Sequence, residues 1–245
     1  GEEEIGSPSL EEFCEANKEL LACDTILVSD TSMLAADKPS IITGLRGLAY
    51  WQIEVTAASR DLHSGIFGGA VANPVLELTK ILSSLSNNDG KITIPGFYDN
   101  VEEVSAEERA LIAKIPFDED EYKANLKIRE TFGEKGYSTI ERTGIRPALD
   151  ICGIWGGYTG EGSKTVLPSK AYAKLSARLV PNQRYAEIAT LVEKHILSIA
   201  PSYVDVKVEQ LHGAESYVCP IDSEAYRAAE RAYKKVFGIR PLPVR

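Results

Sequence analysis

The chain has 245 residues, of which 44% are hydrophobic and 26% are charged, and its formal net charge is −9 at pH 7. This balance is typical of a folded globular protein and argues against a disordered chain. An acidic chain without a basic patch is a poor nucleic-acid binder, and no stretch approaches the ~20 apolar residues that a membrane span needs. We therefore expect neither nucleic acid nor a membrane as a partner.

Four cysteines are far apart in the sequence and form no Cys-x-x-Cys pair: Cys14, Cys23, Cys152 and Cys219. This spacing disfavours a zinc ribbon and a disulfide framework, and it favours a reducing compartment, so we expect a cytoplasmic location. The chain opens on Gly-Glu-Glu-Glu and closes on Pro-Leu-Pro-Val-Arg, which do not resemble natural termini. We expect it to be a piece of a longer protein.

The first 44 residues resemble part of a parallel α/β domain. Ser7-Pro8 predicts a helix start, with Ser7 as N-cap and one buried face through Leu21. Residues 25–29, Thr-Ile-Leu-Val-Ser, form a short apolar run that is typical of a buried parallel strand. Asp30 follows it, at the strand end where ligands collect in open α/β sheets.

The middle of the chain has a different character. Apolar and polar residues alternate from Leu48 to Ala58, and a glycine-rich loop follows. Residues 99–146 are acidic, with helical patches, and predict a peripheral helical excursion. The remaining elements are predicted as helix 71–85, strands 148–155, 165–167 and 171–180, helix 185–199, strand 204–211 and helix 223–237.

The order of the middle elements is β–α–β–β–α–β, which is typical of a ferredoxin-like fold. We therefore predict an α/β protein in which a ferredoxin-like domain, residues 45–212, is inserted in a partial parallel α/β domain. Residues 1–44 and 213–245 form that second domain. The inserted domain is predicted to be a four-stranded antiparallel sheet with two helices on one face.

Carboxylates near the start of the chain admit two interpretations. The run Glu2-Glu-Glu-Ile-Gly-Ser7 can simply precede a helix, where the helix dipole favours acidic residues. Alternatively, neighbouring residues of an extended segment point opposite ways, so that one Glu can bind a metal while the next activates water. Asp30 alone is an ordinary turn residue, but beside Glu4 on one sheet edge it would add a hard donor to a metal site.

Three later residues are also candidates. A lone histidine is more often structural, but His63 lies in a glycine-rich loop, and such loops present side chains outward. Arg178 alternates with apolar residues in a strand, so it either faces solvent or clamps a substrate carboxylate. His212 ends a strand and remains ambiguous. No nucleophile elbow, Walker loop or dinucleotide glycine pattern supports a serine hydrolase, an NTPase or a dehydrogenase.

Six runs, in this order along the chain, resemble the M20 metallopeptidases, in particular their dipeptidase branch. They are Glu2-Glu-Glu-Ile-Gly-Ser7, Val28-Ser-Asp30, Gly44-Leu-Arg-Gly47, Asp61-Leu-His-Ser-Gly65 with Gly68-Gly69, Lys164-Thr-Val-Leu-Pro168 and Ala177-Arg-Leu-Val-Pro-Asn182. Each run alone is weak, but together they are specific and cover almost the whole chain.

The resemblance implies a catalytic domain with two divalent metal ions, zinc or manganese, and an inserted lid domain that forms a homodimer. It also implies a small peptide substrate. The implied roles are Glu3 as general base, Glu4 and Asp30 as metal ligands, His63 as an oxyanion donor in the partner subunit's active site, and Thr165, Arg178 and His212 as substrate-positioning residues.

The family's His-x-Asp motif, bridging Asp and late metal-ligand His do not occur in residues 1–245. Zinc needs about four ligands, so we expect this chain alone to hold metal poorly and to be inactive. The expected activity of the parent protein is metal-dependent hydrolysis of dipeptides or short peptides. Two alternatives stay open: an M20 deacylase or carboxypeptidase that acts on N-acyl amino acids, and a non-enzymatic dimerisation module.

Overall fold

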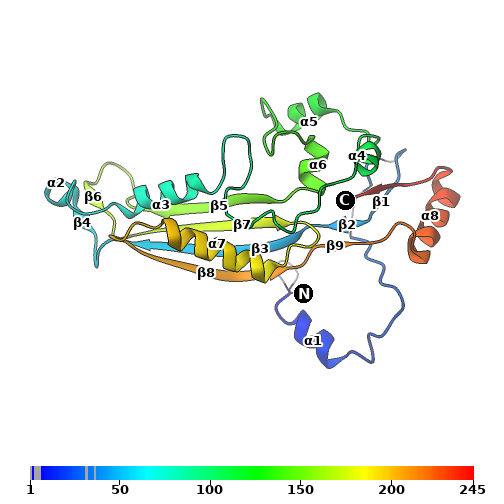
Figure 1. The fold of residues 1–245 in the computed structure, drawn as a ribbon, viewed down its shortest axis with the longest axis horizontal. Helices are drawn as coiled ribbons and strands as arrows, with labels where there is room; N and C mark the ends of the chain where they lie inside the picture. Colours follow the sequence, from blue (N-terminus) through cyan, green and yellow to red (C-terminus); the bar gives the residue numbers. More distant parts are fainter. Residues whose placement is uncertain (1, 3–6, 31–32, 36) are drawn as a thin grey trace.

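The largest unit of the computed structural model, which describes residues 2, 7–30, 33–35 and 37–245, is a four-stranded antiparallel sheet. The strands are β3 (Gly47–Thr56), β5 (Ala148–Gly156), β7 (Lys170–Leu179) and β8 (Asp205–Ala214). Their order is β5-β7-β3-β8, and α3 (Pro74–Ser84) and α7 (Tyr185–Ile199) are the two crossover helices (Figure 1). The predicted ferredoxin-like order is confirmed.

The burial pattern of β3 shows which face of the sheet the helices cover. Alternate residues are fully buried, and Trp51 and Ile53 belong to one apolar cluster with Leu78 of α3 and Val192 of α7. The residues between them are only partly buried. We call this second side the open face; it carries Tyr50, Gln52, Glu54 and Thr56 of β3 and Tyr172, Lys174, Ser176 and Arg178 of β7.

Local signals set the helix boundaries. The side chain of Asn73 caps α3 by accepting hydrogen bonds from the backbone N–H groups of Val75 and Leu76, at 3.0 and 3.4 Å. Helix α8 (Glu224–Phe237) begins after the cap Ser223 and ends at Gly238, whose φ of 77° suits glycine. Among the described residues, no helix combines the length and the apolar composition that a bilayer crossing requires.

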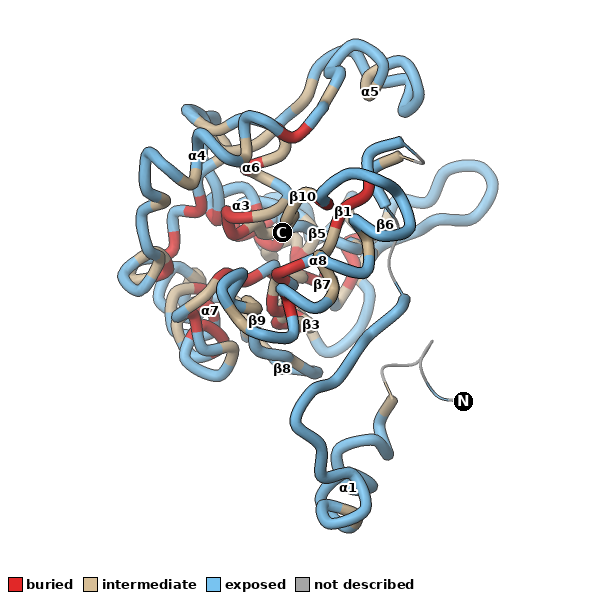
Figure 2. The backbone as a smooth tube through the Cα atoms, turned by 90° about the vertical axis from the view of Figure 1, so that its right-hand side faces the viewer, coloured by how far each residue is buried: buried red, intermediate tan, exposed pale blue. Residues whose placement is uncertain are grey.

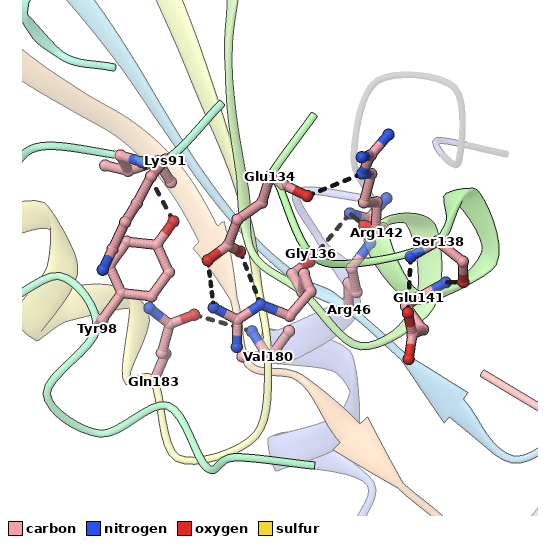
Figure 3. Close-up of polar contacts among 12 residues, drawn as sticks. Arg46, Lys91, Tyr98, Glu134, Gly136, Ser138, Glu141, Arg142, Val180 and Gln183 are labelled. Atoms are coloured by element: carbon pink, nitrogen blue, oxygen red, sulfur yellow. Dashed lines mark hydrogen bonds and ion pairs between the residues drawn. The ribbon is translucent and has the colours of Figure 1, made fainter. Parts of the chain in front are cut away.

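The acidic excursion, residues 99–146, contains three short helices: α4 (Ala106–Ile112), α5 (Glu119–Leu126) and α6 (Thr139–Gly144). A buried ion pair anchors it, because the guanidinium of Arg146 donates two hydrogen bonds to the Glu134 carboxylate, at 2.7 and 2.8 Å (Figure 3). The same guanidinium lies 4.3 Å from the ring centre of Tyr137. Since both charged side chains are almost fully buried, the pairing is a strong constraint on this region.

The two parts of the chain that flank the sheet meet at one end of it. Strand β1 (Ser40–Ile42) pairs in parallel with β10 (Leu242–Val244), and β2 (Gly44–Leu45) pairs antiparallel with β9 (Tyr217–Val218). At the opposite end lie β4 (Leu62–His63), α2 (Ser64–Phe67) and β6 (Val166–Leu167) (Figure 1). Strand β8 continues through Ala214, past the predicted boundary at 212, while the division into two domains stays a prediction.

Two predictions for the first 30 residues are wrong. Helix α1 is shorter, Leu10–Ala16; its N-cap is Ser9 rather than Ser7, and it buries no residue (Figure 2). Residues 25–29 form no strand, and the side chains of Ile26 and Leu27 are 78% and 86% exposed. A buried parallel strand needs neighbours on both sides and helices on its faces, and the described residues provide neither around this segment.

The buried ion pair of the excursion gives a stability test. Replacing Glu134→Ala leaves the charge of Arg146 buried and unpaired, so we expect a loss of about 3–5 kcal/mol in the free energy of unfolding, measured by urea denaturation. Lys135→Ala is the matched control, since Lys135 pairs with Asp89 at 3.6 Å between largely exposed side chains. The loss for Lys135→Ala should stay below ~1 kcal/mol. Equal losses for both variants would contradict the prediction.

Candidate functional site

Two of the predicted site residues, His63 and Thr165, lie in contact at the end of the sheet that carries β4 and β6. The backbone N–H of Ser64 donates to the carbonyl of Thr165 at 3.0 Å, and His63 is paired with Val166 across the two strands. The Nε2 atom of His63 lies 3.1 Å from the Thr165 hydroxyl. Its Nδ1 atom accepts a hydrogen bond from the backbone N–H of Gly65, at 3.0 Å. We call this arrangement the His63–Thr165 pair.

Asp61 ties the loop before His63 to the start of β7. One of its carboxylate oxygens accepts hydrogen bonds from the backbone N–H and the hydroxyl of Ser169, at 2.8 and 3.0 Å. The carbonyl of Ser169 in turn accepts from the N–H of Ala57, at 2.9 Å. Two hydrogen bonds from Ser169 lower the pKa of Asp61: the one from its backbone N–H has the larger effect, and the one from its hydroxyl the smaller. The loop that presents His63 is therefore attached at both of its ends.

Arg178 and His212 lie towards the other end of the same sheet. Arg178 is an exposed residue of the open face, opposite Leu48. Burial lowers the pKa of Arg46, and the nearby charge of Arg178 lowers it further. His212 lies opposite Tyr50, and the two rings stack with centroids 5.1 Å apart and planes 13° apart. A guanidinium and an imidazole, both suited to bind a carboxylate or a carbonyl oxygen, thus occupy one stretch of the sheet.

Two β-bulges lie within two residues of the level of Tyr50. In β8 the extra residue is Leu211, next to His212, and in β5 it is Cys152, whose thiol donates to the Ser176 hydroxyl at 3.2 Å. Burial, followed by a hydrogen bond with Cys152, raises the pKa of Tyr50. Bulges turn side chains away from the regular alternation and are frequent beside active sites. Sequence alternation places Tyr50 on the polar face of its strand, but it does not reveal the bulges or the stacking.

The structure therefore separates the predicted site residues into two groups within one chain. His63 and Thr165 lie at one end of the sheet, and Arg178 and His212 lie towards the other. Along β3, Leu48, at the level of Arg178, and Thr56, where the loop to His63 begins, are eight residue steps apart. At ~3.3 Å per residue this is roughly 26 Å. A dipeptide, the size of substrate expected from the sequence, spans only ~7 Å, so a molecule of that size cannot contact both groups of the same protomer.

The predicted carboxylate site cannot be assembled from the described residues. Glu3 and Glu4 lie outside them, and Asp30 is exposed in an irregular segment rather than at a strand end. In residues 2, 7–30, 33–35 and 37–245, no three His, Cys, Asp or Glu side chains come together in a way that could hold a metal ion. The donors of these residues therefore do not fit a metal centre by themselves.

Comparison with known proteins gives a consistent result. The sequence model of the peptidase dimerisation domain of M20 peptidases matches residues 43–204. The chain is 32% identical to the Beta-Ala-His dipeptidase of Rattus norvegicus over 98% of its own length and 50% of that protein. The chain spans about half the length of the curated relatives it matches.

Two solved structures are similar along the entire chain. The di-peptidase Dug1p of Saccharomyces cerevisiae has a TM-score of 0.86 and 34% identity, covering 100% of this chain and 52% of that one. The M20 family metallo-carboxypeptidase Sso-CP2 of Sulfolobus solfataricus also has a TM-score of 0.86 and 34% identity, covering 100% and 55%. Both likenesses extend well beyond the residues that the dimerisation-domain model matches.

The hydrogen bonds of Asp61 predict a pH dependence of the loop that carries His63. Because its pKa is lowered in the folded chain, the anchor is complete at neutral pH and is lost only as the pH falls through that lowered pKa. In an NMR titration, the Ser169 amide should shift with a midpoint below the ordinary aspartate range. Asp61→Asn should abolish this transition, and a midpoint at or above the ordinary range would refute the anchoring role.

Proposed function

Since the chain belongs to the M20 peptidase family, we propose that the whole protein is a metal-dependent hydrolase of dipeptides and short peptides with a free carboxylate. The two similar proteins named for dipeptides, from Rattus norvegicus and Saccharomyces cerevisiae, support this substrate class. The observation that carries the proposal is the contact between His63 and Thr165 at one end of the sheet, far from Arg178 at the other.

We infer that each active site is completed by a second copy of the chain. Because roughly 26 Å of β3 separates the two groups of residues, the His63–Thr165 pair of one protomer serves the substrate held by the other. A two-fold axis makes this exchange reciprocal and gives two equivalent sites. In the described sheet β5 is an edge strand, and it exposes Ile151, Ile154 and Trp155, which suits pairing with a second lid.

The chemical groups on the two sides complement each other. Arg178 binds the free carboxylate of the substrate with its paired N–H groups, and His212 lies on the other side of β3, stacked on Tyr50 of the open face. His63 of the partner donates a hydrogen bond to the oxygen that becomes negatively charged when water attacks the scissile carbonyl. Thr165 lies against His63 rather than Arg178, which supports a substrate contact from the same side as His63.

The residues implied by the family resemblance complete the proposal. They are Glu3 as the general base and Glu4 and Asp30 as ligands of divalent metal, zinc or manganese. The remaining metal ligands come from parts of the whole protein outside residues 1–245. We also propose a cytoplasmic location, in keeping with four cysteines that are all free.

A second candidate function is carboxypeptidase or deacylase activity towards N-acyl amino acids. The similarity to a protein described as a metallo-carboxypeptidase favours it, and Arg178 suits its substrates equally because they also end in a free carboxylate. Comparing kcat/KM of the whole protein for dipeptides, longer peptides and N-acyl amino acids separates the two. Absence of all three activities in the metal-loaded whole protein would favour the remaining alternative, a non-enzymatic dimerisation module.

Residues 1–245 alone should not catalyse the reaction. They contain at most two of the proposed metal ligands, Glu4 and Asp30, whereas a zinc site needs about four. We expect no dipeptide hydrolysis after addition of zinc or manganese, and metal measured by atomic absorption should be lost on dialysis. The whole protein is the control, and turnover by residues 1–245 at ~1 s⁻¹ or more would show that the ligand assignment is wrong.

Mixed dimers of the whole protein test the exchange between subunits. His63→Ala should leave folding and dimerisation unchanged and lower kcat by ~10²–10³, because one oxyanion donor is lost. Mixing His63→Ala subunits with Glu3→Ala subunits should restore activity, since one of the two sites then has both groups. If sedimentation shows that mixed dimers form but activity does not return, His63 serves its own chain or only the fold.

A further inference from the structure

The His63 imidazole is held at both of its nitrogens by groups of its own chain. The backbone N–H of Gly65 can only donate a hydrogen bond, so the Nδ1 atom that it meets at 3.0 Å must be an unprotonated acceptor. In the neutral ring the hydrogen is then on Nε2. That nitrogen faces the Thr165 hydroxyl at 3.1 Å, whose oxygen can accept it.

We propose that Gly65 is a positioning residue that locks His63 in its Nε2–H tautomer, and that Thr165 is the resting acceptor of that hydrogen. The inference rests on the proposed function, in which His63 donates to the oxygen of the scissile carbonyl. When substrate binds, the Nε2–H hydrogen bond passes from the Thr165 hydroxyl to that oxygen. No covalent bond forms or breaks in this exchange, and the ring needs no change of tautomer before it acts.

The surroundings of Gly65 explain why this position is a glycine. A Cβ atom at Gly65 would lie 2.7 Å from Cε1 and 3.0 Å from Nδ1 of His63, which is closer than the ring allows. The backbone does not demand glycine here, because φ of Gly65 is not in the left-handed region. Gly69 is the opposite case: its φ is +83° and a Cβ atom there would meet nothing within 4 Å. The absence of a side chain at Gly65 therefore leaves room for the imidazole of His63.

The frame around the ring is set before any substrate arrives. Strands β4 and β6 hold His63 opposite Val166, and the hydrogen bond from Ser64 to the Thr165 carbonyl fixes the backbone next to the hydroxyl. Asp61 attaches the preceding loop to Ser169. A donor that is already oriented needs little reorganisation when charge develops on its partner, which is the condition for effective stabilisation of an oxyanion.

The lock can be observed by NMR on residues 1–245, which contain three histidines. We expect a ¹⁵N–¹⁵N coupling across the hydrogen bond from the Gly65 amide to Nδ1 of His63, with the ring hydrogen on Nε2. Gly65→Ala should abolish the coupling and give a mixture of tautomers. Ile66→Ala is the matched control, because this neighbouring side chain is 74% exposed and should leave the coupling intact. A hydrogen on Nδ1 in the unmodified chain, or a coupling that survives in Gly65→Ala, would overturn the proposal.

Kinetics of the whole protein test whether the lock matters for the reaction. Gly65→Ala should lower kcat towards the ~10²–10³-fold loss expected for His63→Ala, with KM little changed. His63→Gln, whose amide N–H reaches near the Nε2 position, should retain more kcat than His63→Asn. Unchanged kcat in a Gly65→Ala protein that has lost the coupling would refute the positioning role. Unchanged kcat in His63→Ala would refute the proposed function of His63 but leave the tautomer lock standing.

Discussion

Strand β3 sets the geometry on which the rest of the molecule depends, because it is hydrogen-bonded on both sides along almost its full length. Its strict alternation directs Trp51 and Ile53 under the helices and Tyr50 to the open face. A slip of one residue would exchange the two faces and expose the apolar set, so the register is strongly fixed. The length of the same strand keeps Arg178 and His63 at opposite ends of the sheet.

This separation is the observation on which the proposed function rests. Within one chain, the sheet is a rigid spacer between the end that carries Arg178 and the end that carries the His63–Thr165 pair. In the function proposed above, a second copy brings the two sides together with one interface and two identical sites. Under that proposal assembly and catalysis are coupled, since a separated protomer lacks the donor for its own substrate.

The two groups of residues are stabilised by different kinds of interaction. The His63–Thr165 pair depends on hydrogen bonds beside the two-residue ladder of β4 and β6, and both of its side chains are exposed. The excursion is held instead by the buried Arg146–Glu134 pair, and Arg46 adds hydrogen bonds to the carbonyls of Arg142 and Arg146 at 3.3 and 3.4 Å. Buried charge pairs are sensitive to the loss of either partner, whereas exposed hydrogen bonds are readily exchanged with a ligand.

Much of the fold is determined by local sequence patterns. Alternation predicted β3 and β7 to within two residues, the apolar period of 3.6 predicted α7 from Tyr185 to Ile199, and Gly238 marked the end of α8. These elements carry their own signal because each has one face that must be buried. Their order was then sufficient to predict the ferredoxin-like topology, and six short runs were sufficient to indicate the family.

Other features were decided only by tertiary contacts. The apolar run at 25–29 looks like a buried strand, but a strand exists only where another strand pairs with it, and none of the described strands does. No local pattern shows that Thr165 lies against His63, because 102 residues separate them and the pairing of β4 with β6 joins them. The stacking of His212 on Tyr50 likewise depends on a bulge in β8. Sequence thus determined which residues are chemically suited to the site, and the tertiary structure decided which of them meet.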